Sequence, residues 1–238
     1  MAEAMRAADG RVVLISGAAR GIGRAIADRL AADGYRLSLG VRTPGRLGEV
    51  FPDALVTRFD AQAPDTAAQW IAATVERFGR IDALVNNAGV LTPFTLAEGS
   101  EAELDRHWEV NVKAPLRLIR AAMPHLVAAG EGRIVTIAST DGKRVRPGSA
   151  LAYAMTKHAV VALTHAARLE GWPHGVRATA LCPGAVDTDL IADLPGVTPK
   201  ADRLAPATIA ASVAFLLALP TNASVAELVL NTRMEASL

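Results

Sequence analysis

Short hydrophobic runs alternate along the whole chain with longer segments whose apolar residues recur every three or four positions. Residues 11–16 form the first run and predict a buried strand. The segment after it repeats Ile22, Ile26 and Leu30 on one face, which predicts a helix. Further strands are predicted at residues 35–41, 54–60, 81–86, 133–138, 176–181 and 228–230, and a further helix at 151–171.

The alternation of strands and helices indicates the class of fold. Residues 101–129 predict a long helix that is broken or bent near Pro115 and Pro124. The strands are too continuously apolar to have a wet face, which is typical of a parallel sheet covered by helices on both sides. We therefore predict a doubly wound α/β fold, with a mostly parallel seven-stranded sheet and helices on both faces (a Rossmann fold). One domain is expected over residues 1–238, with a short flap near 187–206.

Composition and charge exclude several classes of protein. Hydrophobic residues make up 51% of the 238, and 25 lysines and arginines balance 24 aspartates and glutamates, so no cationic surface for nucleic acid is predicted. No apolar run approaches the ~18 residues that span a bilayer, and residues 1–10 lack a hydrophobic signal region. One cysteine and five histidines show no metal-ligand spacing. We expect a cytoplasmic protein without metal, membrane or nucleic-acid partners.

A glycine-rich turn directly follows the first predicted strand. Gly17, Gly21 and Gly23 lie between Ser16 and the helix. Glycines at such a turn let the backbone approach a ligand, and they direct the free N–H groups of a helix N-terminus at a pyrophosphate. The first two glycines are four positions apart, unlike the commonest dinucleotide fingerprint, so a plain strand-to-helix turn is the alternative. The position after the first strand favours dinucleotide binding.

Three polar residues later in the chain have the chemistry of an acid/base site. Tyr153 and Lys157 are four positions apart and share one helix face, and Ser139 follows a predicted strand. An ammonium ~5 Å from a phenol stabilises the phenolate by roughly 3 kcal/mol, which is about two pKa units. Tyr153 is therefore predicted to titrate near neutrality and to exchange a proton with an alcohol or carbonyl. Taken alone, such a pair is more often an ordinary feature of a helix.

Several motifs occur in order along residues 11–190. They are the glycine turn Gly17, Gly21 and Gly23, the run Asn86-Asn87-Ala88-Gly89, Asn111, Ser139, the Tyr153/Lys157 pair, and Pro183-Gly184 followed by Val186 and Thr188. Together they resemble the short-chain dehydrogenase/reductase family of NAD(P)-dependent enzymes. Two departures are that Ser16 stands where the family usually has threonine, and that the serine and tyrosine are one position further apart than is commonest.

The resemblance implies a role for each matching residue. Tyr153 is expected to be the catalytic acid/base, Lys157 to lower its pKa and bind the nicotinamide ribose, and Ser139 to orient the carbonyl. Asn111 is expected to hold a water that links Lys157 to solvent. Asp60 resembles the aspartate that meets the adenine amino group, although an acidic residue at a strand end is also typical of a solvated surface. The other expected cofactor contacts are Gly17, Arg20, Gly21, Ile22, Gly23, Asn87, Ala88, Gly89, Pro183, Gly184, Val186 and Thr188.

Cofactor choice depends on the end of the second strand. In this family an acidic residue there bonds both hydroxyls of the adenosine ribose of NAD, and its charge repels a 2′-phosphate. Here that position is Val41, followed by Arg42 and Thr43, with Arg20 close by in the glycine turn. We therefore predict that NADP(H) is the preferred cofactor, with Arg42 on the 2′-phosphate. NAD(H) is the alternative cofactor, and an ordinary surface position is the alternative for Arg42.

The predicted function is hydride transfer between a nicotinamide cofactor and a small-molecule alcohol, ketone or aldehyde. A non-catalytic nucleotide-binding regulator on the same fold is the rival function, and such a protein is expected to lack the tyrosine, lysine or serine. By resemblance, the helices at 101–129 and 151–171 pair in a homodimer or homotetramer. Residues 231–235 lack the double glycine that accompanies the usual tetramer contact.

The loop before Tyr153 bears on the charge of the substrate. Lys143, Arg144 and Arg146 lie within four positions of one another. Cations at the mouth of a cleft raise the local concentration of anions and clamp a carboxylate or phosphate, so an anionic substrate is one prediction. A solvated loop is the alternative, because Asp141 is also present.

Overall fold

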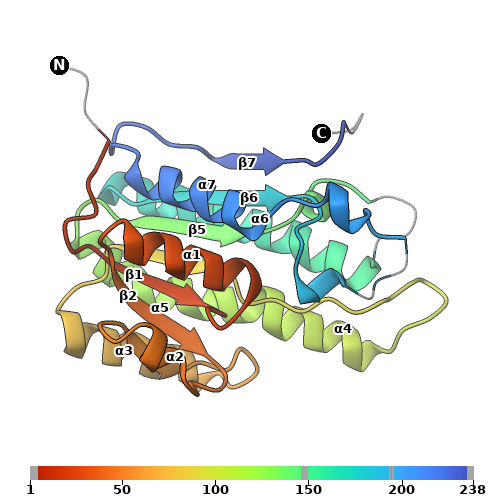
Figure 1. Cartoon of the computed structure of the whole chain (residues 1–238), viewed down its shortest axis with the longest axis horizontal. Helices are drawn as coiled ribbons and strands as arrows, with labels where there is room; N and C mark the ends of the chain where they lie inside the picture. Colours follow the sequence, from red (N-terminus) through yellow and green to blue (C-terminus); the bar gives the residue numbers. More distant parts are fainter. Residues whose placement is uncertain (1–4, 146–149, 193, 195, 235–238) are drawn as a thin grey trace.

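A single parallel sheet forms the centre of the protein (Figure 1). The computed structural model describes residues 5–145, 150–192, 194 and 196–234. The strands have the order β3-β2-β1-β4-β5-β6-β7, and each neighbouring pair is parallel. This confirms the predicted doubly wound sheet. The strands are β1 (Val12–Ser16), β2 (Arg36–Val41), β3 (Leu55–Arg58), β4 (Ala83–Asn86), β5 (Arg133–Ile137), β6 (Arg177–Pro183) and β7 (Glu227–Leu230).

Helices cover both faces of the sheet because successive side chains of a strand point to opposite sides. In β1, Val13 and Ile15 belong to the core under α1 and α7, whereas Val12 and Leu14 belong to the core under α3 and α5. Figure 1 shows α1 and α7 together in front of the sheet. The helices are α1 (Gly21–Ala32), α2 (Leu47–Val50), α3 (Asp65–Phe78), α4 (Glu101–Trp108), α5 (Ala114–Ala128), α6 (Leu151–Gly171) and α7 (Pro206–Ala218).

The long helix predicted at residues 101–129 is divided. A π-helical segment, η1 (Glu109–Lys113), joins α4 to α5, whereas Pro124 lies inside α5 without ending it. The division comes just before Pro115, which has no N–H to offer the carbonyl four residues earlier, that of Asn111. Asn111 therefore lies in an irregular turn whose main-chain carbonyl lacks its usual helical partner.

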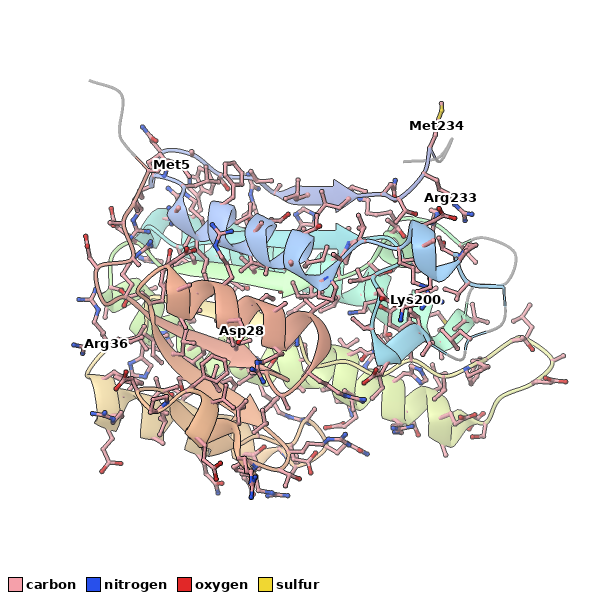
Figure 2. All side chains as sticks on the ribbon, in the orientation of Figure 1. Met5, Asp28, Arg36, Lys200, Arg233 and Met234 are labelled. Carbon is pink, nitrogen blue, oxygen red and sulfur yellow. The ribbon has the colours of Figure 1, made fainter. Side chains whose placement is uncertain are left out.

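The carboxyl ends of the strands and the segment between β6 and α7 lie at one pole of the molecule. That segment contains two short turns, η4 (Asp189–Ile191) and η5 (Lys200–Asp202). Figure 2 shows Lys200 at this pole and Arg36 at the opposite, amino-terminal pole of the strands. Among the described residues, no helix is long and apolar enough to span a membrane.

Candidate active site

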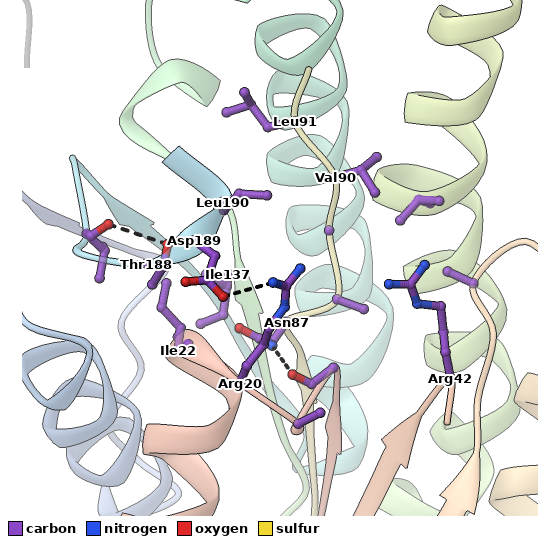
Figure 3. A pocket seen from close by; sticks show the side chains of 18 of the residues that line it. Arg20, Ile22, Arg42, Asn87, Val90, Leu91, Ile137, Thr188, Asp189 and Leu190 are labelled. Carbon is purple, nitrogen blue, oxygen red and sulfur yellow. Dashed lines mark hydrogen bonds and ion pairs between the residues drawn. The ribbon is translucent and has the colours of Figure 1, made fainter. Parts of the chain in front are cut away.

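A cavity of about 580 Å³ extends along the carboxyl ends of the central strands (Figure 3). It is lined by the turns that follow β1, β2, β4 and β6, by the end of β5, and by one face of α6. Of the residues that the sequence proposes for the site, all except Gly23 and Asn111 line this cavity. Motifs far apart in the sequence therefore share one surface.

The glycine turn after β1 is held against the end of β4. The hydroxyl of Ser16 accepts hydrogen bonds from the backbone N–H groups of Asn87 and Ala88, at 2.9 and 3.0 Å, and the amide of Asn87 donates to the Ser16 carbonyl at 2.9 Å. Gly17 has a φ of 71°, and a Cβ there would lie 3.1 Å from the Cα of Ala88. A Cβ on Gly23 would collide with the Gly17 carbonyl. Gly23 thus shapes the turn without lining the cavity.

The start of α1 fits a phosphate-bearing cofactor. The N–H groups of the first helical turn have no partner inside the helix. No side chain caps α1 at Arg20, and its first turn carries no acidic residue. Gly21 and Ile22, at the start of the helix, line the cavity. An anion such as a pyrophosphate is the ligand that these donors and the helix dipole favour.

The end of the cavity that is expected to hold the adenosine, called the adenosine end below, carries exposed charged residues. Arg42 follows β2 and is exposed, and Val41 is buried where an acidic residue would select NAD. Asp60 follows β3 and lines the same end. Its carboxylate accepts a hydrogen bond from the N–H of Gln62 at 3.1 Å and lies 3.4 Å from Arg58. Asp60 is therefore held in place by its own turn and retains lone pairs that face the cavity.

Some lining residues were not predicted from the sequence. Arg106 and Val110 reach the cavity from α4 and η1, one helical turn apart, and Phe59 and Gln62 flank Asp60. None of them belongs to a recognisable motif. The one available signal was the spacing of Arg106 and Val110, which puts both on one helix face.

Ser139, Tyr153 and Lys157 meet at the other end of the cavity, where all three are buried. Lys157 Nζ donates a hydrogen bond of 2.7 Å to the carbonyl of Ile137, and it lies 5.3 Å from the centre of the Tyr153 ring. Ser139 Oγ accepts from the N–H of Asp141 at 3.0 Å. A hydrogen bond also joins Ser139 to Tyr153. The hydroxyls of Ser139 and Tyr153 are thus positioned together at the cavity wall.

The protonation of this buried pair differs from the sequence-based prediction. Burial raises the pKa of Tyr153, the charge of Asp141 raises it further, and the hydrogen bond from Ser139 lowers it only in part. Burial lowers the pKa of Lys157 to about 8. The charge of Lys157 is not among the causes that shift the pKa of Tyr153. The predicted titration of Tyr153 near neutrality is wrong because it omitted desolvation.

Asn111 is buried behind the cavity wall and does not line the cavity. Its Oδ1 accepts from the N–H of Val90 at 2.9 Å, and its Nδ2 donates to the Val90 carbonyl at 3.0 Å and to Thr156 Oγ1 at 3.1 Å. These bonds connect η1 to the turn after β4 and to α6. Both amide protons of Asn111 are thus used within the protein, and the water contact expected of this residue stays a prediction.

Two of the three cations in the loop predicted to border the substrate are paired with carboxylates. Lys143 pairs with Glu227 at 2.5 Å, Arg144 pairs with Asp141 at 2.5 Å, and neither cation lines the cavity. Arg146 lies outside the described residues. Lys143 and Arg144 therefore do not form the anion-attracting mouth that the sequence suggested, because each lies beside a carboxylate that the linear pattern did not reveal.

Arg20 and Arg42 lie on different sides of the cavity (Figure 3). The guanidinium of Arg20 pairs with Asp189, on the segment between β6 and α7, at 2.8 Å. Figure 3 shows Arg20 turned toward Asp189, with Arg42 on the opposite side of the cavity. The flap predicted near residues 187–206 thus contacts the glycine turn, and Gly21 lies against Thr188.

Known proteins are similar to this chain in both sequence and fold. The short chain dehydrogenase family matches residues 11–196. Agropine synthesis reductase of Rhizobium rhizogenes is 42% identical over 219 residues, which cover 90% of this chain and 50% of that protein. The chain thus spans about half the length of this curated relative. Levodione reductase of Leifsonia aquatica is 37% identical over 191 residues, covering 76% of this chain and 71% of that one.

A solved structure extends the comparison. The X-ray structure of an alcohol dehydrogenase from the archaeon Thermococcus sibiricus, complexed with 5-hydroxy-NADP, superposes with a TM-score of 0.85 at 36% identity, covering 92% of this chain and 95% of that one. The family match, these identities and the parallel sheet agree. The chain belongs to the short chain dehydrogenase family of NAD(P)-dependent oxidoreductases.

Proposed function

We propose that the chain is an NADP(H)-preferring oxidoreductase that interconverts an alcohol and a ketone or aldehyde. The observation that carries the proposal is that one cavity is lined by a phosphate-binding turn, by Arg42, and by the buried trio Ser139, Tyr153 and Lys157. A bound nicotinamide dinucleotide would supply or accept the hydride, and the turn after β1 would hold its pyrophosphate. The residues of the chain then have to position the substrate and move the proton.

Tyr153 is suited to donate a proton in the direction of carbonyl reduction. Its raised pKa keeps the phenol protonated at neutral pH, which is the form required of a general acid. Ser139, beside it, donates a hydrogen bond to the oxygen that becomes an alkoxide. Lys157, with a pKa of about 8, is poised to replace the proton that Tyr153 gives away. In this proposal the main-chain carbonyl of Asn111 would hold a water that continues the relay to solvent.

The preference for NADP(H) is supported by the charges at the adenosine end. Val41 and Arg42 line the cavity. Val41 provides no carboxylate to repel a 2′-phosphate, and the guanidinium of Arg42 would bind that phosphate with two parallel hydrogen bonds. The alcohol dehydrogenase of Thermococcus sibiricus was solved with an NADP analogue. NAD(H) would bind the same turn without the contribution of Arg42.

Substrate and assembly are proposed more broadly. We propose a single catalytic domain whose flap, near residues 187–206, borders a small alcohol or carbonyl substrate. The name of levodione reductase specifies reduction of a dione, which supports a small carbonyl compound. We also propose a homodimer or homotetramer, because Trp108 of α4 and Met155 of α6 are 38% and 44% exposed on the paired helices. Light scattering of the purified protein tests the assembly.

An activity panel tests the function. Purified protein is assayed with NADPH and NADH against small ketones, aldehydes, keto acids and sugars, with Tyr153→Phe as the matched inactive control. Turnover that is faster with NADPH and lost in the control supports the proposal. Tight cofactor binding without turnover of any compound would instead identify a nucleotide-binding regulator on this fold.

A further inference from the structure

An ion pair connects the glycine turn to the flap across the cavity mouth. Arg20 Nη1 lies 2.8 Å from Asp189 Oδ2, and the two side chains are 70% and 73% exposed. Both residues line the cavity. A Cβ on Gly21 would lie 3.3 Å from the side chain of Thr188, so the flap packs closely on the turn that carries Arg20. Asp189 is therefore fixed where its carboxylate reaches the Arg20 guanidinium.

The turn that carries Arg20 also lies beside the turn that carries Arg42. Ser16 pairs with Gly40 in neighbouring strands, and the N–H of Gly17 donates to the Gly40 carbonyl at 2.8 Å. The turns after β1 and β2 thus run side by side, and their two arginines line the same cavity. Rotation of the Arg20 side chain away from the flap would bring a second guanidinium toward the end of the cavity where Arg42 lies.

We infer that Asp189 is a specificity-determining residue: it holds Arg20 away from the 2′-phosphate of NADP and so limits the preference of the site for NADP over NAD. The inference rests on the proposed function. A carboxylate and a phosphate make the same bidentate hydrogen bonds with a guanidinium, so they are alternative partners for Arg20. Water and salt screen an exposed pair of this kind, so a bound phosphate competes with Asp189 for Arg20.

Cofactor binding to four forms of the purified protein tests the inference without any turnover. Calorimetric titration gives the dissociation constants of NADP and NAD for the wild type, Asp189→Asn, Arg20→Gln and the double variant. The ratio of the two constants is the readout, because the charge of Asp189 also acts on the pyrophosphate that both cofactors share. Asp189→Asn is expected to raise the preference for NADP by about fivefold, or ~1 kcal/mol, the upper range for an exposed pair. In the Arg20→Gln background the same change should have no effect.

Asp187→Asn is the matched control. Asp187 lies on the same flap, but its carboxylate pairs with Lys200 and Arg203 rather than with Arg20. Its replacement is expected to leave the NADP/NAD ratio unchanged. An equal increase in this control, or in the absence of the Arg20 guanidinium, would assign the effect to general electrostatics and overturn the inference.

Failure of the inference can be distinguished from failure of the proposed function. If Arg42→Ala weakens NADP binding while Asp189→Asn leaves the ratio unchanged, NADP preference stands and the role of Asp189 is refuted. If the wild type binds NAD more tightly than NADP and Arg42→Ala changes neither constant, the proposed preference fails, and the inference fails with it.

Discussion

The two ends of the cavity differ in their exposure to water, and this difference separates their tasks. At the adenosine end, Arg20 and Arg42 are exposed, so their interactions are screened and weak enough to be exchanged between partners. At the end with Ser139, Tyr153 and Lys157 are buried, and burial is the largest cause that moves both pKa values away from their ordinary range. We therefore expect that single surface charges adjust the selection of a cofactor, and that proton transfer depends on the desolvated pair.

The largest effect is expected from Tyr153→Phe at the buried end. The variant keeps the ring and its packing but removes the proton that the reaction requires. Turnover should fall by at least ~100-fold, the usual contribution of a general acid, while the dissociation constant of NADP stays within about twofold. Steady-state kinetics and calorimetry on the same preparation measure both. Retention of most activity would remove Tyr153 from the mechanism.

Lys157→Met is expected to show what the buried ammonium costs in stability. The shift from the ordinary pKa of 10.5 to about 8 corresponds to roughly 3 kcal/mol at neutral pH, and loss of the hydrogen bond to Ile137 offsets about 1 kcal/mol of this. The variant should therefore gain about 2 kcal/mol in the free energy of unfolding at pH 7, while losing activity. Urea denaturation measures the gain.

The stability gain of Lys157→Met should depend on pH, because the pKa of Lys157 is lowered in the folded protein. Between pH 8 and 10.5 the unfolded chain retains the lysine proton and the folded chain does not, so the stability of the wild type rises with pH in this interval. The advantage of Lys157→Met should accordingly shrink toward zero by about pH 9.5. A constant difference from pH 7 to 9.5 would show that Lys157 titrates normally.

Arg42→Ala probes the exposed end, and its effect should be smaller. A charge-assisted hydrogen bond to the 2′-phosphate contributes at least ~1.5 kcal/mol, so the affinity for NADP should fall roughly tenfold. The affinity for NAD, which lacks this phosphate, should change little. Fluorescence titration with both cofactors measures the difference. Equal losses for the two would place Arg42 outside the 2′-phosphate site.

Local periodicity predicted most of the fold because each strand and helix carries its own pattern. β1 begins one residue after the start of the predicted strand at 11–16, and α1 contains the predicted apolar face of Ile22, Ile26 and Leu30. The π-helical turn at Glu109–Lys113 was not predicted as such. The sequence placed a bend near Pro115, but a helical break does not specify its hydrogen-bonding pattern.

Most residues of the ordered motifs line one cavity, whereas contacts defined only by long-range packing were not predicted. Ser139 and Tyr153 line the cavity as expected. The raised pKa of Tyr153 was missed, since spacing along a helix does not reveal desolvation by the surrounding strands. The pairing of Lys143 with Glu227 was missed for a similar reason: 84 residues separate them in the sequence, and only the position of β7 brings them together.

The smallest effect, and the most direct test of the contrast between the two ends, is the response to salt. Raising ionic strength from 0.1 to 1 M shortens the screening length from about 10 Å to about 3 Å, which weakens interactions of exposed charges much more than those of buried ones. The affinity for NADP should therefore fall a few-fold further than that for NAD, and this difference should vanish in Arg42→Ala. The turnover rate at saturating cofactor and substrate should be nearly constant, because Tyr153 and Lys157 are shielded from the ions. If turnover decreased as steeply as NADP affinity, the catalytic end would be open to solvent ions and the proposed division between the two ends would be wrong.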